Sequence, residues 1–174
     1  MIIRKLADYS ALFAALGAVI TANMPQMELY CEIGRLVSIR TEKGAAVAAS
    51  EYLQTTRPTA EGFSPRNVRR MRDFYRMYGD LPELIEEATS LNWTQNVVIM
   101  EAELTMDEQR WYIRKTVKNS LSKTELLRMI QSGAHLEIPL DETAPDWYTE
   151  ENNEISEREQ YEEDPVRTTT HTTC

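Results

Sequence analysis

An arginine-rich segment is the part of this 174-residue sequence whose side chains are best suited to chemistry. Five arginines fall within residues 66–76, in the stretch GFSPRNVRRMRDFYRMYG. At about 100° per residue, one side of a helix here is apolar and holds Val68, Met71, Tyr75 and Tyr78. The other side is a broad cationic arc of Arg66, Arg69, Arg70, Arg72 and Arg76. The pattern predicts a helix that packs with one face and offers the other to an anionic partner.

The chemistry of the cationic arc indicates nucleic acid. Guanidinium forks match phosphate oxygens and the acceptor edge of guanine, and Asn67 is of the right type to pair with an adenine edge. A helix over residues 45–54 precedes the segment, which is the layout of a helix-turn-helix with residues 64–78 as recognition helix, although the turn is longer than usual. The predicted nucleic-acid contacts are Ser64, Arg66, Asn67, Arg69, Arg70, Arg72 and Arg76.

The same arginines also fit an ordinary surface. Ion pairs with Glu83, Glu86, Glu87 or the acidic end of the chain would satisfy them without any ligand. A second, weaker basic stripe consists of Arg110, Arg114 and Lys118 at spacing four, and an ordinary helix surface is the favoured interpretation there. The aromatic residues Tyr75, Trp93, Trp111 and Tyr112 stand at helical spacing beside aliphatics, which favours core or hinge packing over base stacking.

Charge is distributed unevenly along the chain. The formal net charge is −9, from 19 bases and 28 acids. Residues 139–174 hold 11 acids and 2 bases, so this segment alone nets 2 − 11 = −9 and residues 1–138 net zero. We therefore expect two parts, a folded domain over residues 1–138 and an acidic tail over residues 139–174 that is disordered, because few apolar side chains are present to offset its ordering entropy.

Several classes of protein are disfavoured by composition. A hydrophobic content of 42% is typical of a globular protein. Cys31, Cys174, His135 and His171 do not stand at metal-ligand spacing, so we expect no metal and no other cofactor, and two unpaired thiols fit a reducing cytoplasm. The apolar run over residues 12–20 is too short to span a membrane and has helical periodicity, so a core helix is favoured over a secretion signal.

The elements that must position the arginines are all helical. Gly is rare and period-2 alternation is absent, so we predict an all-α, compact multi-helix domain with a helix-turn-helix-like core. Capping signatures at Asp80, Asn92, Thr105 and Ser122 mark helix starts. The expected helices span about 8–22, 25–41, 45–56, 65–78, 81–89, 93–103, 106–119 and 123–132, with Gly133 as the last C-cap and His135 beyond it.

Four motifs resemble a known family. They are LYCEIGRLVSIR at 29–40, GFSPRNVRRMRDFY at 62–75, LNWTQNV at 91–97 and EQRWYIRKTVKN at 108–119 followed by SKTELLRMI at 122–130. In order and spacing they are similar to the N-terminal domain of YhcG-like nucleases, over roughly residues 9–132. The matching positions are Glu32, Gly34, Arg35, Phe63, Ser64, Arg66, Asn67, Arg69, Arg70, Met71, Trp93, Trp111, Tyr112 and Arg114. We expect Glu32, Trp93 and Trp111 to be structural and the arginines to be contacts.

The resemblance implies an all-helical, DNA-associated domain from bacterial mobile elements or defence loci. In that family the domain generally precedes a PD-(D/E)xK nuclease, and the residues after 132 do not supply one, so we expect no catalytic activity. The leading hypothesis is a cytoplasmic, non-catalytic DNA-binding or adaptor module. The alternative is a small acidic inhibitor of a host restriction or CRISPR nuclease that acts by protein contact through the tail. A homodimer is also open, since a single helix-turn-helix seldom reaches specificity without a second half-site.

Overall fold

The computed structural model describes residues 7–137, and every regular element within that range is an α-helix. In chain order the helices are α1 (Ser10–Thr21), α2 (Gln26–Ser38), α3 (Ala45–Thr56), α4 (Pro65–Tyr78), α5 (Pro82–Ser90), α6 (Trp93–Glu101), α7 (Met106–Asn119), α8 (Lys123–Ser132) and α9 (Ala134–Glu137). The all-α prediction is confirmed, and all eight expected helices are present. The predicted acidic tail, residues 139–174, lies outside the described residues, so the expected division at residue 138 stays a prediction.

Side-chain capping accounts for the starts of α4, α6, α7 and α8. At the starts of α6, α7 and α8 the side chain of the predicted N-cap residue accepts a hydrogen bond from the backbone N–H three residues later. The Gln or Glu at that later position accepts in turn from the backbone N–H of the N-cap residue. Asp80 is a correction: Leu81 occupies the N-cap of α5, makes no side-chain cap and packs on the core instead. His135 is a second correction, because it lies within α9, a helix of four residues that is too short to show a period.

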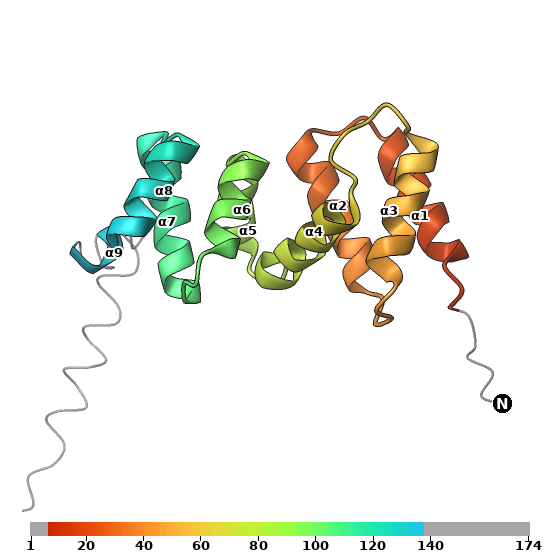
Figure 1. The fold of residues 1–174 in the computed structure, drawn as a ribbon, viewed down its shortest axis with the longest axis horizontal. Helices are drawn as coiled ribbons and strands as arrows, with labels where there is room; N and C mark the ends of the chain where they lie inside the picture. Colours follow the sequence, from red (N-terminus) through yellow and green to blue (C-terminus); the bar gives the residue numbers. More distant parts are fainter. Residues whose placement is uncertain (1–6, 138–174) are drawn as a thin grey trace, which may run out of the picture.

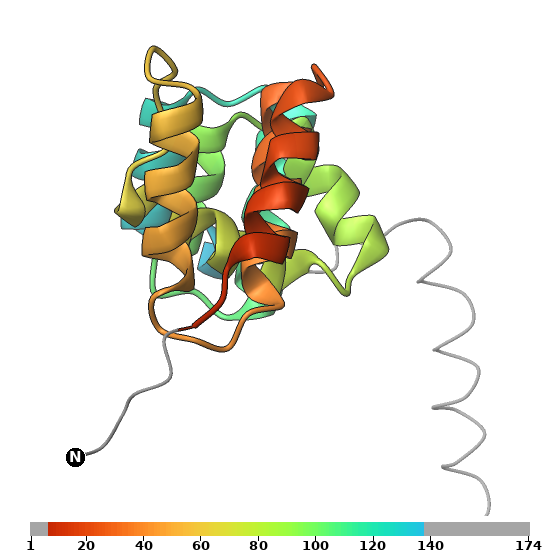
Figure 2. The same cartoon turned by 90° about the vertical axis from the view of Figure 1, so that its right-hand side faces the viewer.

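Two hydrophobic cores divide the helices, and α4 belongs to both. Val68 and Met71 of α4 pack in a first core with α1, α2 and α3. Phe74 and Tyr78, one and two turns further on, pack in a second core with α5 to α8. Trp93 at the start of α6 packs against both. Figure 1 shows α4 running between the two groups of helices, and Figure 2 shows α1 and α3 side by side at the end remote from α8 and α9. The position of α4 is therefore set by the whole domain.

Helices α2 and α4 pack tightly against each other. A Cβ on Gly34 would stand 2.1 Å from the backbone oxygen of Met71, so a glycine is required for this approach. Glu32 and Arg35, beside it, form an i,i+3 ion pair at 2.8 Å. The Glu-Ile-Gly-Arg motif thus places its glycine at the close approach of the two helices, and the structural role expected for Glu32 stays a prediction.

The apolar run over residues 12–20 lies in α1 and forms part of the first core. Leu12, Leu16 and Ile20 are buried there, as a core helix requires. Within residues 7–137, no helix combines the length and the apolar character needed to cross a bilayer.

Candidate nucleic-acid interface

The N-terminal end of α4 is held by the turn that precedes it. Ser64 is the N-cap, and its hydroxyl accepts from the backbone N–H of Asn67 at 3.2 Å, with Pro65 at the first helical position. The carbonyl of Phe63 accepts from the Ser50 hydroxyl at 2.6 Å and from the Gln54 amide at 3.2 Å, both on α3. The turn of residues 57–64 is longer than the ~3–4 residues of a helix-turn-helix, and these bonds fix it to α3 despite its length.

Asn67 is engaged inside the protein at both ends of its amide. Its Nδ2 donates to the Gly62 carbonyl at 2.6 Å, and its Oδ1 accepts from the indole N–H of Trp93 at 2.8 Å. Gly62 has φ +92°, and a Cβ there would stand 2.2 Å from the hydroxyl oxygen of Tyr30. Ser64 and Asn67 were predicted as nucleic-acid contacts, and the structure places both in the support of the helix start.

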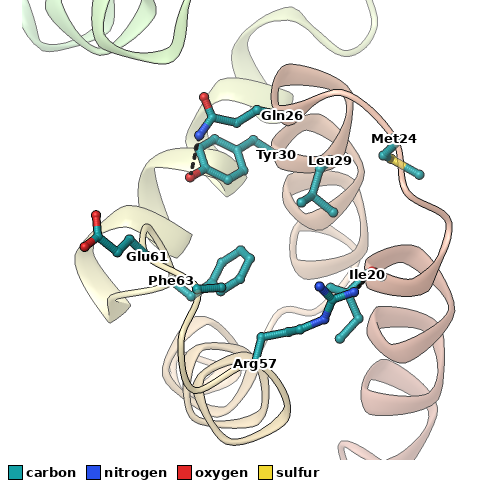
Figure 3. A pocket seen from close by; sticks show the side chains of 9 residues that line it. Ile20, Met24, Gln26, Leu29, Tyr30, Arg57, Glu61 and Phe63 are labelled. Atoms are coloured by element: carbon teal, nitrogen blue, oxygen red, sulfur yellow. Dashed lines mark hydrogen bonds between the residues drawn. The ribbon is translucent and has the colours of Figure 1, made fainter.

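A small cavity of about 270 Å³ lies behind the turn, between the end of α1 and the start of α2. Arg57 crosses it and donates to the carbonyl of Ile20 at 2.5 Å, which joins the turn to α1. Figure 3 shows the Arg57 guanidinium directed at Ile20, and Phe63 facing the same space as Tyr30. Tyr30 in turn accepts from the Gln26 amide at 3.3 Å. The cavity walls therefore support the start of α4.

The C-terminal end of α4 is anchored to α7. Tyr78 is fully buried, and its hydroxyl donates to the Gln109 side-chain oxygen at 2.6 Å. Burial raises the pKa of Tyr78, so the phenol stays protonated as a donor. With Asn67 at one end and Tyr78 at the other, α4 is held along its length.

The five arginines of α4 divide into two groups. Arg70 pairs with Glu101 at 2.5 Å and Arg72 with Asp73 at 2.8 Å, and these two side chains are only 25% and 24% exposed. Arg66, Arg69 and Arg76 are exposed, and we call them the outer arginines. Arg66 is 77% exposed and reaches Glu101 only at 3.7 Å. Within the described part of the chain, Arg69 and Arg76 have no carboxylate partner.

The carboxylates that pair with α4 were not among those expected. Glu83, Glu86 and Glu87 make no ion pair with α4 in residues 7–137, whereas Glu101, at the end of α6, holds two of its arginines. Glu101 is 31 residues from Arg70 along the chain, so no local pattern could have identified it. Asp73, the neighbour of Arg72, was visible in the sequence as the residue that interrupts the arc.

The second basic stripe is largely occupied. Arg114 donates to Glu87 at 3.0 Å, and Arg110 stands 3.7 Å from Asp107. Lys118 is exposed. These contacts agree with the ordinary-surface interpretation for two of its three residues. Trp111 and Tyr112 are buried, as core packing predicts.

One titratable cluster was not predicted. The His135 ring bonds to Glu108 through Nε2 at 3.0 Å and to the Tyr112 hydroxyl through Nδ1 at 2.8 Å. The same Glu108 caps α7 by accepting from the Thr105 backbone N–H at 2.7 Å. Since the Tyr112 residue is fully buried, a substrate has no access to the phenol. The cluster joins α9 to α7.

Comparison with known proteins identifies a family for this chain. The sequence profile described as the DUF1016 N-terminal domain, which is the N-terminal region of the YhcG-like nuclease family, matches residues 14–137. Searches of curated proteins and of solved structures gave no match. The matched range spans α1 to α9 and includes all of α4.

Proposed function

The chain belongs to the DUF1016 N-terminal domain family, and from this premise we propose that it is a non-catalytic DNA-binding or adaptor module. The outer arginines of α4 contact the phosphate backbone. The bacterial mobile-element or defence-locus setting that the resemblance implies is part of the proposal. The role is one of binding, and it assigns no residue to catalysis.

The observation that carries this proposal is the exposure of three guanidinium groups on a helix that two hydrophobic cores hold in place. Arg66, Arg69 and Arg76 extend over ten residues of helix, which is about 15 Å at ~1.5 Å per residue. That length matches the axial rise of four to five base pairs at ~3.4 Å each. Because α4 is fixed by both cores, little ordering of the backbone is needed when phosphate binds.

The paired arginines have a secondary place in the proposal. Arg70 and Arg72 would have to leave Glu101 and Asp73 to reach a phosphate. The carboxylates of these pairs are 49% and 46% exposed, so water screens the pairs and their strength stays near the ~0–1 kcal/mol of a surface ion pair. DNA phosphates can therefore replace these carboxylates. Glu101 thereby sets how strongly this face attracts DNA.

The direct test compares two variants of the full chain that lose the same charge. In one variant Arg66, Arg69 and Arg76 are changed together to Gln. In the control the three residues changed to Gln are exposed and lie away from α4: Lys43 in the turn before α3, and Lys123 and Arg128 in α8. We expect the first variant to bind a labelled duplex at least about tenfold more weakly at low salt, with the control within about twofold of the unchanged chain. Equal loss in both variants would show that only net charge matters.

The alternative role, an inhibitor that meets a basic nuclease through the acidic tail, rests on residues outside the described range. No feature of residues 7–137 favours it over DNA binding. If neither the chain nor its variants bind DNA at low salt, this alternative becomes the better account.

A further inference from the structure

The outer arginines also suit a second anionic partner, one that this chain carries itself. We propose that the acidic segment over residues 150–164 docks on the outer arginines of α4 and competes there with nucleic acid. The competition with nucleic acid rests on the proposed function, whereas the contact between the segment and α4 does not.

Charge complementarity is the first argument. The segment contains eight acids and one base, and so nets 1 − 8 = −7: Glu150, Glu151, Glu154, Glu157, Glu159, Glu162, Glu163 and Asp164 against Arg158. Residues 1–138 hold 17 acids and 17 bases and net zero, and the other three acids and one base lie elsewhere in residues 139–174. The excess charge of the chain therefore lies outside the domain, while an open cationic face lies on it.

The second argument is that α4 lacks enough local acids. Arginines three or four positions apart on one helix repel each other, as Arg66 and Arg69 do, and as Arg72 and Arg76 do. Glu101 and Asp73 are already used by Arg70 and Arg72. Arg69 and Arg76 form no ion pair within residues 7–137, although Asp73 and Asp80 lie three or four positions from them. An external run of carboxylates relieves this repulsion without displacing an existing ion pair.

The third argument is reach. The described chain ends at Glu137 in α9, and 12 residues lie between it and the acidic segment, which is 150 − 137 = 13 steps from Cα to Cα. Thirteen such steps extend to at most ~43–47 Å. A domain of this size has a radius of gyration of only ~14 Å, and α4 lies in the middle of the molecule with α9 at one end (Figure 1). The segment can therefore reach α4 of its own chain, at an effective concentration of order millimolar.

The consequence for DNA binding follows from mass action. A tethered anion that occupies the outer arginines must leave before a phosphate binds. The apparent association constant for DNA is therefore that of the unoccupied face multiplied by the fraction of molecules in which the face is unoccupied. Salt weakens both contacts by screening. We expect the acidic segment to lower DNA affinity at low salt and to have little effect at high salt.

The test uses the full chain and a full-length variant in which the eight acids become Gln or Asn. The side-chain Nε–H resonances of Arg69 and Arg76 are followed by NMR at about 50 mM and about 500 mM salt, with Arg57 and Arg128 as internal references off this face. We expect Arg69 and Arg76 to differ between the two proteins at low salt only, and the references to stay unchanged. Identical Arg69 and Arg76 resonances in the two proteins would overturn the proposal.

Two further measurements distinguish a failure of the docking proposal from a failure of the proposed DNA-binding function. Dilution leaves the resonances unchanged if the segment binds its own chain, whereas a shift on dilution would mean that a second copy supplies it and would overturn the intramolecular contact. In anisotropy at low salt, we expect the variant to bind duplex DNA at least about fivefold more tightly. If no protein binds DNA, the proposed function fails, and the NMR comparison still decides whether the segment docks.

Discussion

Replacing Gly34 by alanine tests whether the α2–α4 contact fixes the position of the arginine helix. The new Cβ would stand 2.1 Å from the backbone oxygen of Met71 and 2.7 Å from its carbonyl carbon. Contacts under 3.0 Å do not persist, so the two helices must separate by about 3.0 − 2.1 = 0.9 Å. Both atoms belong to the α4 backbone, and no side-chain rotation relieves the clash.

The magnitude follows from two opposing effects. Overpacking of a tight interior costs ~1–3 kcal/mol, and the upper end applies because helices rather than side chains must move. Alanine is favoured over glycine inside a helix by ~1 kcal/mol. We therefore expect Gly34→Ala to lower the free energy of unfolding by about 2 kcal/mol, as the difference of these two effects.

Gly17 of α1 offers a matched control. It is also a helix glycine, but its Cβ would meet the hydroxyl oxygen of Tyr52 at 2.7 Å, the free end of a half-buried side chain. Because that side chain can move, Gly17→Ala retains most of the gain that alanine has over glycine inside a helix. We expect this variant to be up to ~1 kcal/mol more stable than the unchanged chain.

Urea denaturation followed by tryptophan fluorescence measures both variants. With a slope of ~2 kcal/mol per molar urea, a loss of 2 kcal/mol lowers the midpoint for Gly34→Ala by about 1 M at unchanged slope. A Gly34→Ala midpoint equal to that of Gly17→Ala would refute the reasoning, because it would show that the backbone approach at Met71 is not tight.

Three further outcomes are expected. Glu101→Gln releases two arginines and should tighten DNA binding about two- to fivefold, as measured by fluorescence anisotropy. Glu103 is exposed and forms no ion pair in residues 7–137, so Glu103→Gln should leave DNA affinity unchanged. Equal effects of the two substitutions would refute a local role for Glu101. Asn67→Ala leaves the Trp93 N–H unpaired and should cost ~1–3 kcal/mol in thermal unfolding, with base preference unchanged; an altered base preference would make Asn67 a reader. The hydrogen bond from the backbone N–H of Thr105 is the main cause that lowers the pKa of Glu108. The ionised carboxylate therefore stabilises the folded protein above its ordinary pKa, and this contribution is lost as the pH falls through the lowered pKa. Glu108→Gln should show a smaller fall in Tm between about pH 5 and about pH 3 than the unchanged chain, and an equal fall in Tm would refute this.

The fold was predictable wherever its determinants are local. Capping boxes at Asn92, Thr105 and Ser122 are read from four consecutive residues, and the structure has each of them. Asp80 has the same local signature, yet Leu81 takes the cap position because its side chain packs on the second core. Helix α9 has too few residues for a periodic signal.

The candidate site was predictable in outline and not in its contacts. Periodicity alone places the arginines on one face of α4 and the apolar residues on the other. Val68, Met71 and Tyr78 are buried as predicted, whereas Phe74 is buried and Tyr75, expected on that face, is only half-buried. Which arginines are open depends on Glu101, a residue that only the packing of α6 brings near. Asn67 looked free for the same reason, since the indole of Trp93 that engages it is 26 residues away.

The salt dependence of DNA binding tests the central claim most directly. Each phosphate contact contributes about −0.9 to the slope of log Kobs against log salt. Three outer arginines therefore predict a slope of about −2.7 in the full-length background whose eight acids in residues 150–164 are Gln or Asn, where no competing segment is displaced by salt. The account predicts that changing Arg66, Arg69 and Arg76 to Gln brings this slope close to zero, and that the control with Lys43, Lys123 and Arg128 changed keeps it. A slope that is the same in both variants would contradict the assignment of DNA binding to α4.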